Sequence, residues 1–499
     1  MIIFKKCSSL FLVAAINLSV IQSMYGQLSQ NNEIHIPINI DKEEDFTVLP
    51  LKEKGILVLN SQSTLFGKKA FLNFLKFDST LTLQWETKFE IGDNFELEKY
   101  FFNLDNLYCL FKETEKTNIK ILKLDLEKGF GFLTEAKMLT KMDIEFFAAV
   151  GNKVIIGGKY NDRPVVELGR LFDASFKVLP HLHANNVKLS AIEVNEETDE
   201  IYVMHRDDRK CNFSFSIYDY EGRLVKIMEL GGKNKVILSG KIITLPNNKL
   251  MLSGNFSENC SDFSTGFYLM PLANQEEIKF FYFADLKNFY SYLPLKRQEK
   301  ITARMNTKKA KGKDIKMRYR INLHEPISIG NEITLLAEVY YPEYKNTVML
   351  ERSILNSVST RPSKEYNNYK FTHALICTFD TTGTKTWDYS INLKNLESTT
   401  LNEKVQITVY EEGYLVAYPK EELINSNFIT KNFESKDFST LDMKKNDEKK
   451  IGVSDLTLDL VSWFDHTYLA FGNKTIRAES GIISKEYFYI SKLKYTSPL

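Results

Sequence analysis

Glycine and proline are scarce in this sequence, with 23 Gly and 12 Pro among 499 residues. A chain with so little of either is poor in disorder, so long unstructured segments are not expected. Long apolar runs are also missing: beyond residue 26, no stretch approaches the ~18 consecutive apolar residues that mark a membrane-spanning helix. We therefore expect the chain beyond that point to be soluble or attached to a surface, without a membrane span.

Cysteine is scarce as well, and no Cys-x-x-Cys pair is present. Apart from Cys7, the cysteines are Cys109, Cys211, Cys260 and Cys377, which lie far apart in the sequence. Buried thiols that behave as small hydrophobic side chains are the favoured interpretation. A disulfide between Cys211 and Cys260 is the alternative if the protein is exported.

Recognisable catalytic motifs are missing: there is no Gly-rich phosphate loop, no Gly-x-Ser-x-Gly and no His-Glu-x-x-His. His181 and His183 could hold a metal ion with a third ligand, but an exposed loop is the favoured interpretation. His205, Asp207 and Asp208 would suit proton transfer or calcium binding, but a solvated turn is the favoured interpretation. We assign no catalytic, cofactor or metal residue, so any catalytic site would have to be assembled by folding.

The N-terminal segment has the layout of a secretory signal peptide. Lys5 and Lys6 precede an apolar run from Ser9 to Ile21, which is too short to span a bilayer and is followed by small and polar residues. We expect cleavage after Gly26, which leaves residues 27–499 as the mature protein. The expected location is the periplasm, the outer-membrane surface or the secreted fraction.

Strand-forming aromatic residues are abundant, with 25 Tyr and 35 Phe. Short apolar runs opened by a turn residue recur about every 48 residues, with two longer intervals, starting at residues 55, 106, 152, 200, 248, 331, 413 and 466. A unit of this length with four short strands has the size of a propeller blade. We therefore predict one all-β domain over residues 27–499, a β-propeller of seven or eight four-stranded blades.

Most of these units also contain a hairpin with an Asp at its turn. The segments FDSTLTLQW and FDTTGTKTW share one frame, in which Asp78 and Asp380 are each followed seven residues later by Trp85 and Trp387. The Asp is predicted to accept hydrogen bonds from the backbone ahead of it, and Gly383 to adopt positive φ. Side chains alternate after the turn, so one face of the outgoing strand is expected to be buried. The motif is therefore structural.

Eight units are counted, and seven is the close alternative because the fifth and seventh lack a clean Asp turn.

The two ends of the chain are predicted to share a blade. The last unit ends at Leu499 without room for an outer strand, whereas the strand-like segment 33–40 precedes the first unit. We expect residues 33–40 to pair with the strand near 485–494, because an array of blades is stable only when its last sheet is completed.

Two insertions interrupt the repeat, at about 284–322 and 345–372. The first is predicted to contain a short helix that Asp285 caps and that Pro294 breaks or redirects. The apolar positions of this helix, at helical spacing, are Leu286, Phe289, Tyr290 and Leu293. The second insertion, like the run 433–450, is predicted to be a polar loop, and loops of this kind often carry function.

Basic residues gather at the end of the first insertion, where eleven Lys or Arg stand against two acidic residues. Removing this +9 and the +2 of the signal peptide from the formal net charge of +1 leaves −10 on the rest of the chain. Such a segment can bind anionic lipid headgroups or acidic glycans, or it can lie as a solvated helix and loop on the chain's own acidic surface. Nucleic acid is the least fitting partner for an exported protein. The predicted anion-binding arm comprises Lys296, Arg297, Lys300, Arg304, Lys308, Lys309, Lys311, Lys313, Lys316, Arg318 and Arg320.

Three segments carry a resemblance to a known type of protein: DLKNFYSYLPLKRQEKI from residue 285, LHEPISIGNEITLLAEVYYPEY from 323 and YKFTHALICTFDTTGTKTWDYSI from 369. Together they resemble an uncharacterised family of exported bacterial propeller-like proteins, which has the same order of basic helix, Glu-x-Tyr-Tyr-Pro strand and Asp-to-Trp hairpin. The resemblance implies a location in the bacterial envelope or outside the cell, and no activity. The positions of interest in the strand motif are Glu338, Tyr340, Tyr341 and Pro342.

Two functions remain open at this point. The first is a non-catalytic binding or scaffolding propeller of the cell envelope, whose partner is an anionic lipid headgroup, an acidic glycan or another envelope protein. The second is a hydrolase or lyase acting on a saccharide or lactone at the mouth of the central channel, which fold analogy alone supports. No cofactor is expected. Three or more carboxylates or histidines converging on the propeller axis, or a bound metal, would favour the enzyme.

Overall fold

The computed structural model describes residues 27–39, 42–64, 71–92, 94–103, 105–182, 184–231, 235–313, 315, 317–352, 358–431, 439–444, 453–477 and 484–496. The expected signal peptide, residues 1–26, and most of the polar run 433–450 lie outside these ranges. Within the ranges, no helix combines the length and the apolar character that crossing a membrane requires.

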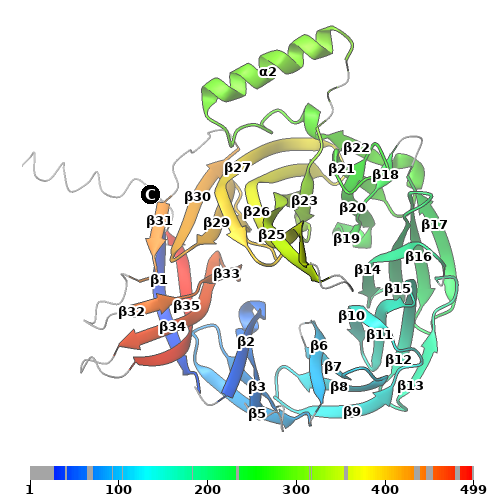
Figure 1. Ribbon diagram of the computed structural model, residues 1–499, viewed down its shortest axis with the longest axis vertical. Helices are drawn as coiled ribbons and strands as arrows, with labels where there is room; N and C mark the ends of the chain where they lie inside the picture. The colour runs from blue at the N-terminus through cyan, green and yellow to red at the C-terminus, as the bar shows by residue number, and fades with distance from the viewer. Residues whose placement is uncertain are drawn as a thin grey trace, which may run out of the picture. The chain divides into compact units, whose positions relative to one another are not determined.

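Eight antiparallel sheets make up the described chain (Figure 1). Each is a blade of four strands, and in three blades the first position is divided between two short strands. The fold is an eight-bladed β-propeller, so the all-β prediction is confirmed and the alternative count of seven is wrong. The chain also divides into two compact units, which are described separately below.

The first unit comprises Met1–Asp93, Leu126–Phe130 and Lys404–Leu499 and contains three blades. Its elements are β2 (Lys42–Pro50), η2 (Lys52–Lys54), β3 (Ile56–Thr64), β4 (Phe71–Phe77) and β5 (Leu83–Glu90) in the first blade; β28 (Gln406–Val409), β29 (Gly413–Lys420), β30 (Leu423–Thr430) and β31 (Ser439–Asp442) in the seventh; and β1 (Gln27–Pro37), β32 (Val453–Leu456), β33 (Asp459–Ser462), β34 (Thr467–Arg477) and β35 (Ser484–Thr496) in the eighth.

The second unit comprises Asn94–Asp125 and Gly131–Glu403 and contains five blades. Its elements are β6 (Phe95–Phe102), β7 (Asn106–Glu113), β8 (Asn118–Asp125) and β9 (Gly131–Lys137); β10 (Asp143–Val150), β11 (Lys153–Tyr160), β12 (Arg163–Arg170) and β13 (Ser175–Val178); β14 (Val187–Asn195), β15 (Glu200–Asp207), β16 (Asn212–Asp219) and β17 (Leu224–Leu230); β18 (Val236–Ile237), β19 (Lys241–Thr244), η3 (Pro246–Asn248), β20 (Leu250–Ser257), β21 (Gly266–Pro271), η4 (Gln275–Glu277) and β22 (Lys279–Tyr282); and η5 (Phe283–Asp285), α2 (Leu295–Ala310), β23 (Arg320–Leu323), β24 (Ile327–Ile329), β25 (Glu332–Arg352), β26 (Val358–Asp380) and β27 (Lys385–Ser398).

The apolar core consists of separate clusters, each lying between two neighbouring blades of the same unit. In the second unit, Phe267 of β21 and Leu335 of β25 belong to one such cluster and are fully buried. In the first unit, Val58 of β3 and Leu469 of β34 do the same between the first and eighth blades. Because the apolar area lies between the sheets, the strand ends and connecting loops remain available for other roles.

Strand β1 completes the eighth blade as its outer strand. It pairs antiparallel with β35, with Gln27 opposite Thr496 and Pro37 opposite Tyr487. The prediction that the N-terminal strand pairs with the C-terminal one is confirmed. The pairing begins earlier than residue 33, and its register ends with Pro37 opposite Tyr487, after which the backbone N of Ile38 still donates a hydrogen bond to the carbonyl oxygen of Glu486 at 3.1 Å.

A buried ion pair fastens β1 to its blade. The carboxylate of Glu33 lies 3.0 Å from Nζ of Lys474, which is only 2% exposed. Glu33 also accepts hydrogen bonds from Ser491 of β35 and lies 2.6 Å from Nε2 of His35. Burial by itself would raise the pKa of Glu33, but these hydrogen bonds and the charge of Lys474 outweigh it and lower the pKa to about 2.

The Asp turns form as predicted. Oδ1 of Asp380 accepts hydrogen bonds from the backbone N of Thr382 at 2.9 Å and of Thr384 at 2.8 Å. Gly383, between them, has a φ of 74°. Asp78 makes the equivalent contacts in the first blade, at 2.8 and 3.0 Å. The repeated motif is therefore a turn-forming device in both units.

The helix of the first insertion begins later than predicted. Segment 285–293 is a series of turns, and α2 starts only after Pro294. The carboxylate of Asp388 accepts hydrogen bonds from the backbone N of Lys287 at 3.2 Å and of Asn288 at 2.6 Å, which holds this segment in a non-helical course. The prediction of a helix before Pro294 is therefore wrong, because a tertiary contact overrides the local apolar spacing. The expected basic helix is present as α2.

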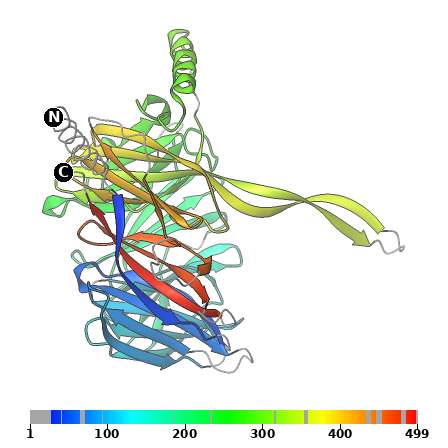
Figure 2. The ribbon, with the colours of Figure 1, turned by 90° about the vertical axis from the view of Figure 1, so that its left-hand side faces the viewer.

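The second insertion is not a loop. Strands β25 and β26 continue through it, with a register that runs unbroken from Lys345 opposite Glu365 to Arg352 opposite Val358. Figure 2 shows this hairpin extending well beyond the other strands of its blade. The loop prediction for 345–372 is wrong, because a ribbon that leaves its sheet needs only ladder hydrogen bonds and not the alternation of apolar residues by which strands were recognised.

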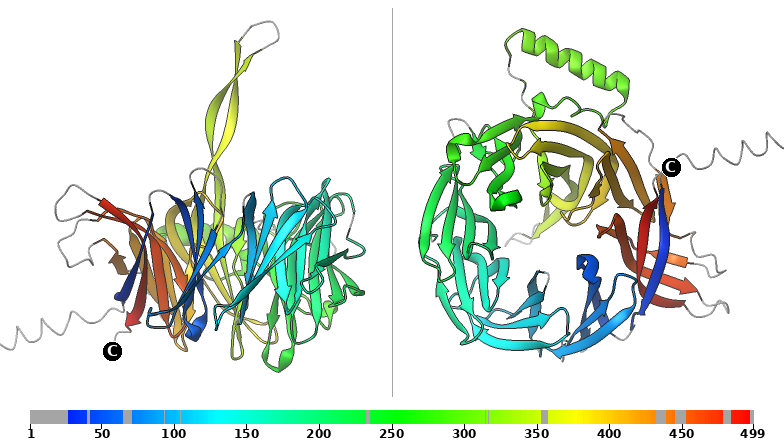
Figure 3. Two further views of the ribbon diagram at one scale, coloured as in Figure 1. Left: turned by 90° about the horizontal axis from the view of Figure 1, so that it is seen from below. Right: turned by 180° about the vertical axis from the view of Figure 1, so that it is seen from behind.

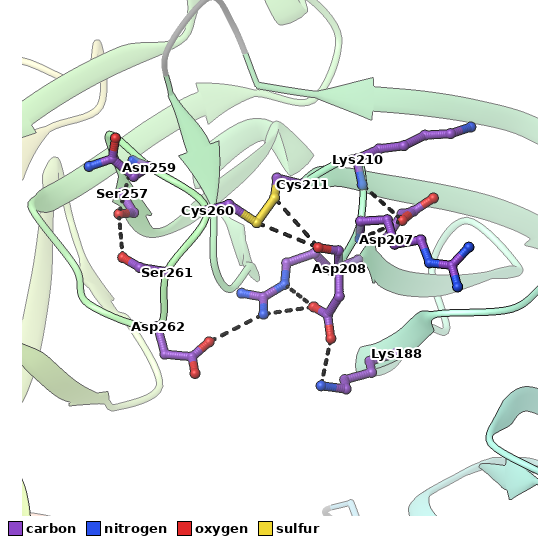
Figure 4. Close-up of a disulfide and its surroundings, with 12 residues drawn as sticks. Lys188, Asp207, Asp208, Lys210, Cys211, Ser257, Asn259, Cys260, Ser261 and Asp262 are labelled. Atoms are coloured by element: carbon purple, nitrogen blue, oxygen red, sulfur yellow. Dashed lines mark hydrogen bonds and ion pairs between the residues drawn. A yellow bond between two sulfur atoms is a disulfide. The ribbon is translucent and has the colours of Figure 1, made fainter.

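Cys211 and Cys260 form a disulfide, with Cα atoms 5.6 Å apart (Figure 4). It joins the turn after β15 to the segment after β20, and both sulfurs face the carbonyl oxygen of Asp208. Cys109 and Cys377 are buried thiols. The favoured interpretation thus holds for Cys109 and Cys377, whereas the alternative, a disulfide, holds for the other two.

We expect Glu33→Gln to lower the free energy of unfolding at pH 7 by about 3 kcal/mol, because it removes the carboxylate that faces the buried Lys474 charge at 3.0 Å. Since the folded-state pKa of Glu33 lies below its unfolded value, the wild-type advantage should be full above about pH 4.5 and fade as the pH falls toward 2. Urea denaturation across this range measures it.

Glu53→Gln, at an exposed position of the same unit, is the matched control and should leave stability nearly unchanged. Equal stabilities of Glu33→Gln and wild type at pH 7 would show that the ion pair does not fasten β1.

Candidate functional site

A cleft of about 760 Å³ opens in the second unit beside the sixth blade. Its walls come from the turns before α2, the first turn of α2, strand β23 and the segment before it, and strands β25, β26 and β27. Figure 3 shows α2 running along the outside of the sheets of this unit. The first insertion and the base of the long hairpin therefore build the cleft together.

Four cationic side chains line this cleft: Arg297 of α2, Arg318 and Arg320 at β23, and Lys394 of β27. Arg320 is held over the ring of Phe263, with its guanidinium carbon 5.0 Å from the ring centroid. The described lining residues include no Asp or Glu. A ligand that neutralises this charge must be anionic.

Four tyrosines share the lining with these cations: Tyr292, Tyr319, Tyr340 and Tyr341. Burial raises the pKa of Tyr292, Tyr319 and Tyr340, so their hydroxyls stay protonated and can donate hydrogen bonds. Tyr341 is 44% exposed. The cleft therefore offers flat apolar ring faces beside positive charge, a combination suited to a ligand with both rings and acidic groups.

His373 supports this wall from within the core. Its ring stacks on Tyr292 with centroids 3.9 Å apart and an interplanar angle of 2°. Nδ1 lies 2.8 Å from the hydroxyl oxygen of Thr372, and Nε2 has no hydrogen-bond partner within the described part of the chain. Because the side chain is 1% exposed, burial lowers its pKa to about 3, so the imidazole is neutral. His373 thus fixes the Tyr292 ring without adding charge.

A bulge in β27 places Lys394 at the rim. His373 pairs with Asn392, and two positions earlier Phe371 pairs with Leu396, so residues 393–395 loop out of the ladder. Lys394 and Asn395 both have positive φ, 51° and 55°, which is costly for residues other than glycine. The Asn392 side chain stabilises the bulge by accepting a hydrogen bond from the backbone N of Lys394 at 2.7 Å. Such bulges are often found beside functional sites.

The predicted anion-binding arm is only partly gathered in the cleft, to which it contributes Arg297, Arg318 and Arg320. A second depression, of about 800 Å³, lies under α2 and contains Arg304, Lys308 and, again, Arg318. The two depressions therefore share one wall.

The remaining arm residues point elsewhere. Lys309 pairs with Asp285 at 3.1 Å. Lys316 lies outside the described residues. Four further lysines are exposed, and no described carboxylate makes an ion pair with them: Lys296, Lys300, Lys311 and Lys313.

A separate acidic cluster lies around Glu338 of the Glu-x-Tyr-Tyr-Pro strand. Oε1 of this fully buried carboxylate is 3.1 Å from Nε2 of His324, whose Nδ1 is 3.6 Å from Glu403. Nearby, Glu325 forms an ion pair with Lys241. Among the described residues, no group of three or more His, Cys, Asp or Glu side chains is placed to hold a metal ion.

Glu193 of β14 has the most perturbed carboxyl group near this cluster. Burial and the charge of Glu325 raise its pKa to about 7, against the opposing effects of Lys241 and of the hydrogen bond from the backbone N of Ile242, at 3.3 Å. A carboxyl group with this pKa changes its charge near neutral pH.

The histidine and acidic motifs of the sequence are not brought together. His181 is exposed in a turn, and His183 lies outside the described residues. Asp207 caps a turn by accepting hydrogen bonds from two backbone N–H groups ahead of it, at 2.9 and 3.0 Å. Asp208 pairs with Arg206 at 2.8 Å and with Lys188 (Figure 4). These acidic residues therefore form a structural turn, as the favoured interpretation stated.

Several lining residues had no signal in the sequence. Tyr292 lies in the segment that was predicted to be a helix, and no function was predicted for it. Tyr319 stands between two basic residues of the arm, and only the basic residues were predicted to bind a ligand. Lys394 reaches the cleft only because of the bulge, which no local pattern announced. Tyr340 and Tyr341 carry a sequence signal only through the resemblance of the Glu-x-Tyr-Tyr-Pro strand.

No protein-family model matches this sequence, and no curated protein matches it. Solved structures with a similar course of the chain include the β-propeller domain of the trilobed protease from Pyrococcus furiosus, at 11% identity and a TM-score of 0.35, covering 79% of this chain and 93% of that one. The polysaccharide lyase Uly1 is 9% identical with a TM-score of 0.37, covering 80% of this chain and 90% of that one. A prolyl endopeptidase is 9% identical with a TM-score of 0.37, and the match covers 89% of this chain and 54% of that one. These values carry no functional conclusion.

We expect the free energy of unfolding of the wild type to fall as the pH rises from about 4.5 to 7. One cause is Glu193, which keeps its proton up to about pH 7 in the folded state but loses it near pH 4.5 in the unfolded state. Glu193→Gln should reduce this fall, whereas Glu197→Gln, at an exposed turn position, should not. Urea denaturation at pH 5 and pH 8 measures the difference. Parallel pH profiles for wild type and Glu193→Gln would contradict the raised pKa.

Proposed function

We propose that this protein is a non-catalytic binding propeller whose cleft takes an acidic saccharide. The proposal rests on one observation: four cations and four tyrosines line a single cleft whose described lining includes no carboxylate. The cations attract the acidic groups of the ligand, and the tyrosines offer faces against which its rings can lie. The volume of about 760 Å³ falls in the range of small-molecule sites.

The lining chemistry favours binding over catalysis. A general base must reach the ligand, and His373, although it is a lining residue, is only 1% exposed with its ring stacked on that of Tyr292. Burial raises the pKa of the cleft residues Tyr292 and Tyr319, so their hydroxyls are poor bases near neutral pH. The alternative, a hydrolase or lyase, is favoured by a different place, the group of Glu193, Glu325 and Glu338, where a carboxyl group titrates near pH 7.

The other cations of the arm assist from a distance. Residues such as Lys296, Lys300, Lys311 and Lys313 are exposed on and after α2, so they raise the local concentration of a polyanion without contacting it in the cleft. An anionic lipid headgroup would respond to the same charges, but it would not need the ring faces of the tyrosines.

We further propose that the protein is exported from a bacterial cell and acts in the envelope or outside it. The layout of residues 1–26 supports this, as does the Cys211–Cys260 disulfide, because disulfides persist in oxidising compartments.

We expect Arg318→Gln and Arg320→Gln each to weaken binding of a galacturonate disaccharide by roughly tenfold, because each removes a charge-assisted contact worth about 1.5 kcal/mol. Isothermal titration calorimetry at low and physiological salt measures this, and the wild-type affinity should fall as salt rises.

Lys300→Gln is the control, since it removes an exposed charge of α2 that does not line the cleft. Equal losses in all three variants would mean that net charge and not the cleft binds the ligand. Binding to anionic vesicles but not to the disaccharide would favour a lipid headgroup. Cleavage of the saccharide, lost in Glu193→Gln, would favour the enzyme.

Export makes a separate prediction. The intact mass of the protein purified from its native bacterium should correspond to a chain that begins at Gln27. Recovery of an uncleaved chain from the cytoplasm would contradict the proposed location without bearing on the cleft.

A further inference from the structure

Four tyrosines form a continuous row along the base of the long hairpin. Tyr340 and Tyr369 have ring centroids 5.6 Å apart, Tyr369 and Tyr366 are 5.0 Å apart, and Tyr366 and Tyr344 are 6.3 Å apart. The row crosses between the two strands, since Tyr340 and Tyr344 belong to β25 and the other two to β26. Tyr340 also lines the cleft, so the row begins at the wall of that site.

The row becomes more exposed away from the cleft. Tyr340 is half-buried, whereas Tyr366 is 42% and Tyr344 is 52% exposed. The position of the row is fixed by the ladder, in which Tyr344 lies opposite Tyr366, and by a hydrogen bond from the Tyr366 hydroxyl to the carbonyl oxygen of Thr399 at 3.1 Å. Tyrosine rings held in this way supply contact area at a low cost in conformational entropy.

The surroundings of the row differ in charge from those of the cleft. Arg320 lies opposite Tyr340 at the cleft end of the row, whereas Lys370, next to Tyr369 in β26, is 3.1 Å from Glu397 and 4.0 Å from Glu343, so its charge is balanced. A ligand on the row would therefore be held by ring contacts and not by attraction between charges. That chemistry fits the apolar faces of sugar rings better than it fits phosphates or sulfates.

The size of the cleft makes the row relevant. A site of about 760 Å³ holds a small ligand, so a longer chain bound there must leave across one of its walls. The wall at Tyr340 leads directly onto three further rings. We propose that the natural ligand is a polysaccharide whose acidic end portion occupies the cleft while the following sugars stack along Tyr369, Tyr366 and Tyr344. This inference rests on the proposed function and names its ligand as a polymer.

The test compares the binding of a galacturonate disaccharide, tetrasaccharide and octasaccharide by calorimetry. Wild type should bind the octasaccharide roughly tenfold or more tightly than the disaccharide, because each ring contact is worth about three- to tenfold in affinity. In Tyr344→Ala/Tyr366→Ala this gain should largely disappear, while disaccharide affinity stays unchanged. The part of the gain that the double substitution removes should be insensitive to salt, in contrast to binding in the cleft.

Two controls keep the result specific. Tyr344→Phe retains the ring and should retain the gain, and Phe172→Ala removes a ring that is 95% exposed in the third blade and should have no effect. Thermal melting of each variant verifies that it is folded.

The outcomes separate this inference from the proposed function. Equal affinity for all three lengths, or a gain that survives the double substitution, overturns the inference but leaves the acidic saccharide site intact. Failure to bind any length overturns both. Binding to phosphatidylcholine vesicles that depends on Tyr344 and Tyr366, without a length effect, would assign the row to a membrane surface and overturn the inference.

Discussion

Apolar side chains cover both faces of each blade, and only neighbouring blades can bury them. In β7, every residue from Leu107 to Phe111 is at most 2% exposed, although successive side chains of a strand point to opposite faces. Tyr108 and Leu110 belong to the cluster shared with the third blade, so Leu107, Cys109 and Phe111 face the other way. A single blade would leave one of these surfaces in water. The fold therefore exists only as a stack, and no blade can be lost without exposing its neighbour.

The same constraint explains the buried charges of β1. A last sheet without an outer strand would present an open edge, and the N-terminal strand closes it. A purely apolar contact would tolerate a slipped register, whereas the carboxylate of Glu33 meets Lys474 and Ser491 in one register only. Burying this ion pair costs desolvation energy, but the pair specifies the register in which β1 aligns with β35.

The repeat could be predicted from the sequence because its cause is local. Runs such as that beginning at Asn106 reflect strands buried on both faces, and turns such as that at Asp380 are encoded within five residues. The insertions could not be predicted in this way. The course of segment 285–293 is decided by Asp388, about 100 residues later, and the hairpin of 345–372 is held by ladder bonds that any polar sequence can make. The candidate site suffers most, because it joins residues of the first insertion to a bulge in β27 that no local pattern announced.

Placing a site on insertions has a further physical consequence, which concerns its charge. Arg297, Arg318 and Arg320, all of the first insertion, line one cleft whose described lining includes no carboxylate, and within a compact core such a grouping of charge would be destabilising. Outside the stacked sheets, water screens this repulsion, and the apolar contacts between blades do not depend on it. The propeller therefore provides stability while the insertions carry unfavourable electrostatics. A ligand that neutralises the cations relieves part of that repulsion, so the cost of assembling the charges is recovered in the binding of an anion.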